Sequence, residues 1–159
     1  MIMKRFCLVS LLILVAFYVR GQGKNQLNDV IISSIKSYMY EDSINYNKID
    51  KYSITYNILV DGLPRSFPYD SLRNVYFYTH LNPSSLIKSK RREFKKGTSI
   101  LKISIRALED KIIIIIFPQS VKLKRNIFHF RVSDWVIYTY AYSQEQKKWI
   151  LIKKKEGGI

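Results

Sequence analysis

Five consecutive isoleucines, Ile112–Ile116, followed by Phe117, constrain the fold of this chain more than any other segment. Successive side chains of a strand point to opposite faces of a sheet, so an uninterrupted apolar run leaves neither face suited to water. Such a run is short for a helix but has the usual length of a strand. We therefore predict a central strand that is covered on both faces or paired along both edges.

Alternating runs surround this central strand. Before it, Leu101, Ile103 and Ile105 alternate with polar residues, and after it residues 121–132 alternate again. Two further runs, at 135–142 and 148–153, flank a polar stretch, which is typical of a hairpin. Four strands in succession predict an antiparallel meander in the second half of the chain.

The first half predicts one helix and two strands. Between Gln26 and Tyr40 apolar residues recur at helical spacing, which predicts an amphipathic helix. Residues 52–60 alternate with a period of two, and the aromatic run 74–79 is expected to pair back against them. Together the elements predict an α+β fold, with this N-terminal helix packed on an antiparallel sheet of five or six strands. By element order alone, the cystatin-like and NTF2-like folds are candidates.

The amino terminus has the layout of a secretory signal peptide. Lys4 and Arg5 precede an apolar run from Phe6 to Val19. This run is shorter than the roughly 20 residues of a membrane-spanning helix but fits the roughly 7 to 15 of a signal-peptide core. We expect residues 1–21 to be cleaved, leaving residues 22–159 as a single globular domain in the periplasm or at the cell surface. The alternative is an uncleaved amino-terminal anchor.

Cleavage would leave a strongly basic domain without cysteine. The chain has 27 Lys and Arg against 12 Asp and Glu, a net charge of +15. Lys4, Arg5 and Arg20 precede the expected cut together with the only cysteine, so a charge of +12 remains. We therefore expect no disulfide, no zinc–thiolate site, no metal and no cofactor. The charge favours anionic partners, while export argues against nucleic acid.

The strongest functional candidate is a cluster of positive charge around Glu93 and Phe94, just before the meander. We expect it to form an exposed loop that attracts phosphates, sulfates or lipid head groups, with an affinity that falls as salt is added. The alternative is a solvated loop whose charges only aid solubility. The basic residues of the cluster are Lys88, Lys90, Arg91, Arg92, Lys95 and Lys96.

Two further basic groups and one aromatic stripe complete the binding candidates. Tyr138, Tyr140 and Tyr142 fall on one face of their predicted strand, where their rings could stack on sugars or bases. Cross-strand packing is the alternative role for these rings. Alternation could also place several cations on one surface. The basic groups are Lys122, Lys124 and Arg125, and Lys147, Lys148, Lys153, Lys154 and Lys155.

Catalysis has weak support in the sequence. His80 and His129 are the only histidines and are isolated from each other, and there is no G-x-S-x-G, Walker or H-E-x-x-H motif. A small hydrolase in the cone of an NTF2-like sheet would need one of these histidines in a deep pocket beside an acid.

Two non-catalytic functions remain. One is an inhibitor or immunity-type protein that inserts the basic loop around Arg91 and Arg92 into the acidic cleft of a secreted enzyme or toxin. The other, which we favour, is a binding module whose basic surface meets an anionic glycan, a lipid head group or an acidic protein. The charge excess is the sequence feature that supports this preference.

Two patterns lie near the ends of the chain. The basic signal peptide ends in Gly21-Gln22, and the carboxy-terminal part contains Trp135–Tyr140 followed by Lys148–Ile152. Together they resemble small uncharacterised exported proteins of the Bacteroidota. That group has no assigned activity, so the resemblance implies only a periplasmic or surface location.

Overall fold

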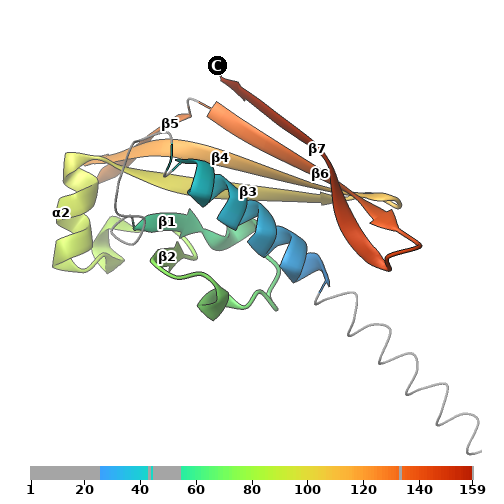
Figure 1. The fold of residues 1–159 in the computed structure, drawn as a ribbon. Helices are drawn as coiled ribbons and strands as arrows, with labels where there is room; N and C mark the ends of the chain where they lie inside the picture. Colours follow the sequence, from blue (N-terminus) through green and yellow to red (C-terminus); the bar gives the residue numbers. More distant parts are fainter. Residues whose placement is uncertain (1–25, 43, 45–54, 133, 159) are drawn as a thin grey trace, which may run out of the picture.

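The structure is a computed structural model that describes residues 26–42, 44, 55–132 and 134–158. Within these ranges it contains two α-helices and a mixed seven-stranded sheet, which confirms the predicted α+β class. Residues 26–42 are helical and lie across one face of the sheet, whereas α2 (Lys88–Lys96) lies at one end of it (Figure 1). The expected signal peptide, 1–21, falls outside the described residues.

The strand order is β2-β1-β3-β4-β6-β7, and β5 pairs with β4. Short 3-10 turns, η1 to η3, occupy Val60–Gly62, Tyr69–Ser71 and Pro83–Ser85. The strands are β1 (Tyr56–Leu59), β2 (Val75–Tyr78), β3 (Thr98–Ala107), β4 (Lys111–Lys124), β5 (Ile127–Val132), β6 (Asp134–Ser143) and β7 (Lys148–Gly158).

The prediction of a wholly antiparallel sheet of five or six strands is wrong in the first half of the chain. β1 runs parallel to both β2 and β3. Parallel neighbours need a connection of about a dozen residues or more, because the chain must return to the end of the sheet at which it started. The segment between Leu59 and Val75, with η1 and η2, is long enough for that return. The cystatin-like and NTF2-like assignments stay predictions.

β4 is the central strand that the isoleucine run predicted. Its first part, 111–116, pairs with β6, and its last part, 119–124, pairs with β5 along the same edge, while β3 pairs along the other. Arg125 and Asn126 both have positive φ angles, 46° and 67°, which suit a two-residue hairpin turn. The alternating run 121–132 is therefore two strands joined by a tight turn.

The main core lies between the sheet and the helix of residues 26–42. The Tyr140 hydroxyl and Ser34 Oγ form a buried hydrogen bond of 2.8 Å across this interface. None of the helices in the described part of the chain is long and apolar enough to cross a membrane. The buried residues of this core include Ile31, Ile35, Ile58, Leu101, Ile103, Ile112, Ile114, Ile116, Val136, Tyr138 and Tyr140.

A second, smaller core lies on the opposite face of the sheet, under α2. Phe94 of α2 is fully buried there and packs with Ile100, Val121 and Leu123. Its ring also meets the ring of Phe128 edge to face, with the centroids 5.3 Å apart. Because these partners come from β3, β4 and β5, the second core fastens α2 to the β4–β5 hairpin.

Candidate functional site

The basic cluster that we expected to be a loop is the helix α2. The expectation was wrong because this segment carries an apolar anchor, Phe94, that is fully buried against the sheet. Gly97 ends the helix with a φ of 102°, a backbone angle that glycine adopts without strain. Lys90 and Arg91 precede Phe94 by four and three residues, so they share its face of the helix.

Lys90 holds α2 to its surroundings. Its Nζ donates to Glu93 Oε2 at 2.8 Å and lies 3.6 Å from the centroid of the Tyr76 ring. The Lys90 side chain is only 12% exposed. The charge of Lys90 is therefore engaged within the protein.

Arg91 holds the other side of α2. Its guanidinium donates to the Pro83 carbonyl oxygen at 2.8 Å and to the side-chain oxygen of Asn126, at the tip of the β4–β5 hairpin. This second contact links α2 directly to the hairpin turn. Both Lys90 and Arg91 thus position the helix, although both were predicted from the sequence to bind a ligand.

Glu93, the acid within the cluster, is satisfied by neighbouring donors. Burial alone would raise the pKa of Glu93, but hydrogen bonds from Lys90, Asn57 and Thr98 outweigh it and lower that pKa. Asn57 is 2% exposed and donates to Glu93 Oε1 at 3.1 Å. Burial, together with the Glu93 charge, raises the pKa of Tyr78 to about 12. The Glu93 carboxylate therefore serves the structure.

The remaining cations of α2 face away from the sheet. They are exposed, and within the described residues none of them makes a hydrogen bond or ion pair. A rigid helix with one buried face holds these charges close together without neutralising them. They are Lys88, Arg92, Lys95 and Lys96.

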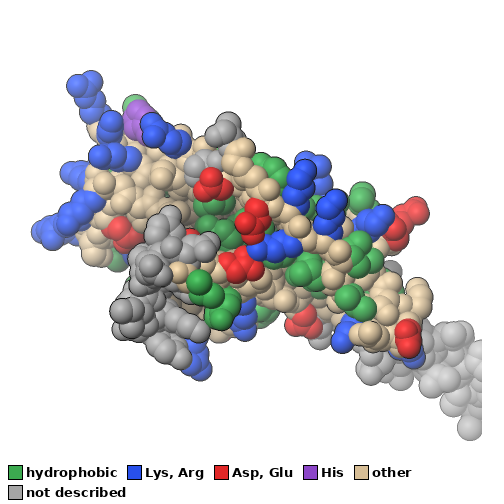
Figure 2. Space-filling view, turned by 45° about the horizontal axis from the view of Figure 1, so that its top comes forward, with side chains coloured by type: hydrophobic (Ala, Val, Ile, Leu, Met, Phe, Trp, Pro, Cys, Tyr) green, Lys and Arg blue, Asp and Glu red, His purple; other side chains and the backbone are tan. Residues whose placement is uncertain are grey.

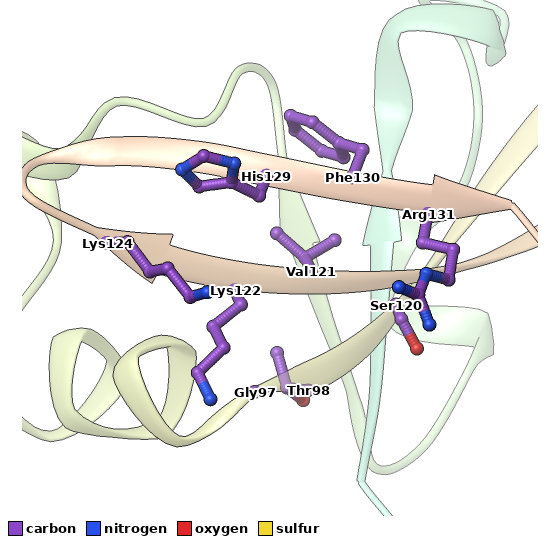
Figure 3. Close-up of a pocket in the computed structure, with 9 residues that line it drawn as sticks. All are labelled: Gly97, Thr98, Ser120, Val121, Lys122, Lys124, His129, Phe130 and Arg131. Atoms are coloured by element: carbon purple, nitrogen blue, oxygen red, sulfur yellow. The ribbon is translucent and has the colours of Figure 1, made fainter.

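A basic groove lies beside α2, on the other face of the β4–β5 hairpin. Lys122 stands opposite His129 in the ladder and Ser120 stands opposite Arg131, so all four side chains share one face (Figure 3). The groove is open and has a volume of about 650 Å³. Its lining contains no acidic residue and consists of Gly97, Thr98, Ser120, Val121, Lys122, Lys124, His129, Phe130 and Arg131.

Together, the outer side of α2 and this groove form the basic end of the molecule. Figure 2 shows Lys and Arg side chains gathered at the end where α2 and the hairpin lie. The contacts of Arg91 and Phe94 join the two parts into one unit. We define the basic end by Lys88, Arg92, Lys95, Lys96, Lys122, Lys124, Arg125, His129 and Arg131.

The tyrosine stripe is mostly core. Tyr138 and Tyr140 are 0% and 5% exposed, so their rings pack inside the protein instead of presenting a stacking surface. Tyr142 is half-buried and packs edge to face on Trp149, with the centroids 5.4 Å apart. Of the three tyrosines, only Tyr142 retains an accessible ring.

A second hollow, of about 460 Å³, gathers carboxylates between the first helix and β6–β7. Lys154 forms ion pairs there with Glu41 and Glu156, and Asp42 and Asp134 also line the hollow. Across the described ranges, no three acidic, histidine or cysteine side chains are arranged to hold a metal ion. Lys154 therefore serves an internal ion-pair network that ties β7 to the helix.

Neither histidine is placed as the hydrolase alternative requires. His80 is exposed, and its Nδ1 lies 3.2 Å from the Thr79 hydroxyl. His129 lies in the open groove, whose lining has no acid. The described residues therefore do not assemble a deep histidine–acid pocket around either ring.

Lys122, Lys124 and Arg125 were candidates from the sequence, but the groove that Lys122 and Lys124 line was not predicted. Thr98 and Arg131 were not identified as parts of a site, because their strands were not yet placed side by side. The useful signal was the pair Arg125-Asn126, where a turn would fold 127–132 back onto β4.

Comparisons of this chain with protein-family models, with curated proteins and with solved structures gave no significant match.

Proposed function

We propose that this protein is an exported, non-catalytic binding module whose basic end holds an anionic partner. Acceptable partners are a phosphorylated or sulfated glycan, a lipid head group or an acidic protein surface. One observation carries the proposal: among the described residues, the basic end presents cations without an ion-pair partner on two adjoining surfaces, and the acid beside them, Glu93, is engaged by Lys90, Asn57 and Thr98.

The shape of the basic end suits an extended anion. Its groove is open to solvent, so it can accept part of an anionic chain without enclosing it. Ser120 supplies a hydroxyl donor next to Lys122 and Arg131, and a donor beside cations forms strong hydrogen bonds to phosphate or sulfate oxygens. Like charges held close together also raise the local concentration of anions around them.

Rigidity adds to this effect. Because Phe94 and Arg91 fasten α2 to the hairpin, the cations need little ordering when a ligand binds. Preorganised groups lose less entropy on association than groups on a loop would. The attraction is electrostatic and exposed, so it should weaken strongly with salt.

Thermal unfolding of the purified protein tests the proposal, with inorganic polyphosphate and heparin as probes and neutral dextran as control. A ligand at 100 times its dissociation constant adds about 2.7 kcal/mol to stability. We expect both polyanions to raise the melting temperature at low salt, high salt to remove the effect, and dextran to have none. If neither polyanion stabilises the protein at low salt, the proposal is wrong.

Matched charge reversals locate the effect. Lys122→Glu with Lys124→Glu should remove most of the stabilisation by polyphosphate. Lys102→Glu with Lys153→Glu changes the net charge equally but lies outside the basic end, and should retain most of it. Equal losses in the two variants would mean that only the overall charge matters. Arg91 is unsuitable for this test because its guanidinium positions α2.

A further inference from the structure

The face of the sheet opposite the first helix is only partly covered within the described residues. α2 packs on one end of this face, over Ile100, Val121 and Leu123. The rest of the face spans β3, β4, β6 and β7, which are neighbours in the sheet (Figure 1). We call this remaining area the open face.

The register of the strands lines up the side chains of the open face in rows. Residues directly opposite each other in antiparallel strands share a face. The first row runs from Arg106 through Ile113 and Thr139 to Lys153. The second row runs from Ser104 through Ile115 and Ile137 to Lys155.

A third row also has apolar side chains on its central strands, β4 and β6. Lys102 stands opposite Phe117, and Trp135 stands opposite Gly157. A side chain at position 157 would collide with the Trp135 ring, since a Cβ built there lies 2.3 Å from it. The Lys155 ammonium is 5.5 Å from the centroid of the same ring, which places the Lys155 and Trp135 side chains together.

The open face therefore has an apolar centre between two basic margins. Lys102 and Arg106 on β3 and Lys153 and Lys155 on β7 are exposed. Between them the apolar side chains are half-buried, and Ile115 at the middle is 9% exposed. The strand positions of these three rows include no acidic residue.

The dimensions of the open face match a helix. Three strand spacings of about 4.8 Å separate β3 from β7, so the two basic margins lie about 14 Å apart. A helix with its side chains is about 10–12 Å wide. It could rest on the apolar centre while its flanks reach both margins. α2 already shows that this side of the sheet accepts a helix through one apolar residue, Phe94.

The charge of the open face and the depth of its apolar side chains indicate which kind of partner fits it. A second copy of this chain would bring its own Lys and Arg rows against these, and like charges repel. A lipid surface would need apolar side chains that protrude, whereas Ile115 lies recessed between exposed cations. A helix with an apolar stripe and acidic flanks satisfies both the centre and the margins.

We propose that the open face docks an acidic amphipathic helix of a partner protein, which lies between the β3 and β7 cations. Its apolar stripe covers Ile113, Ile115 and Ile137, and its carboxylates pair with Lys102 or Arg106 on one side and Lys153 or Lys155 on the other. This surface is separate from the basic end, so the two proposals can fail independently.

A designed peptide tests the docking proposal by fluorescence anisotropy on the purified protein. The probe is a helical peptide with a leucine stripe flanked by glutamates. One control peptide has lysines in place of the glutamates, and another has serines in place of the leucines. We expect the probe to bind at least about tenfold more tightly than either control, because both charge and apolar contact contribute. Equal binding of the probe and the serine peptide would overturn the proposal.

Protein variants locate the binding. Lys102→Glu with Lys153→Glu should weaken probe binding by about tenfold or more, since both margins lose attraction. Lys122→Glu with Lys124→Glu, an equal change in charge on the basic end, should weaken it less than about twofold. If the Lys122→Glu, Lys124→Glu variant lost more affinity than the Lys102→Glu, Lys153→Glu variant, the peptide would bind at the basic end. Self-association through the open face would mean that its occupant is a second copy of this chain. Competition by phosphatidylglycerol vesicles for the open face would mean that its occupant is a lipid surface. Each of these results rejects the proposal.

Discussion

Truncation of Phe94 to alanine should detach α2 from the sheet. The Phe94 side chain is fully buried in the second core. Its ring meets the rings of Tyr78 and Phe128 edge to face, with the centroids 5.8 and 5.3 Å away. The remaining ties of α2 are mainly polar, through Arg91 and through Glu93. Phe94 is thus the apolar anchor of the basic end.

The cost of Phe94→Ala follows from this environment. Replacement of a buried phenylalanine by alanine typically costs about 3–5 kcal/mol, which combines lost transfer energy and the cavity left behind. We expect about 4 kcal/mol, because no part of Phe94 is exposed and its edge-to-face pairs are lost with it. That is a large fraction of the roughly 5–15 kcal/mol that separates a typical folded domain from its unfolded state.

Urea denaturation followed by circular dichroism measures this loss, and Phe130→Ala is the matched control. Phe130 lies on β5, in the hairpin against which Phe94 packs, but it is 51% exposed, so its truncation should cost less than about 1 kcal/mol. Phe94→Ala should also weaken binding of polyphosphate, since the cations of α2 are no longer held beside the groove. A difference between the two variants below about 1.5 kcal/mol would refute the role given to Phe94.

Three further predictions test the packing. Tyr140→Phe should cost about 1 kcal/mol in urea denaturation, because the hydroxyl loses its buried bond to Ser34, and no change would argue against that bond. The pKa of Glu93 is lower in the folded protein than in the unfolded chain, where it is about 4.3. The ionised carboxylate therefore contributes its full stabilisation of the fold above the unfolded pKa, and this contribution disappears as pH falls through the folded pKa. Denaturation midpoints should thus decline more steeply below that pH in the wild type than in Glu93→Gln, and parallel curves would contradict this. Gly62→Ala should cost about 1–3 kcal/mol, since its Cβ would lie 1.8 Å from the Ile103 carbonyl oxygen, and a neutral substitution would show that the backbone yields there.

The sequence predicted the second half of the fold better than the first. Period-two patterns and the isoleucine run indicate strands directly, because the pattern itself states which faces are buried. Strand direction has no such local signal. β1 and β2 are parallel because of the path taken by residues 60–74, and that path depends on tertiary contacts.

The candidate site was predicted in part. The charge cluster 88–96 was identified, but its helical form depends on the burial of Phe94, which cannot be known before β4 and β5 are placed. For the same reason, Lys90 and Arg91 could not be separated from the free cations. The groove required the turn at Arg125-Asn126, whose positive φ angles are unusual for arginine and leave only a weak trace in the sequence.

Amide chemical-shift mapping of the isotope-labelled protein with inorganic polyphosphate locates the anion-binding surface residue by residue. If the basic end binds anions, the perturbed amides cluster at low salt in residues 88–98 and 119–131, and added salt reverses the shifts. Perturbations centred on β3 and β7, or spread evenly over all exposed lysines, would contradict the assignment of anion binding to the basic end.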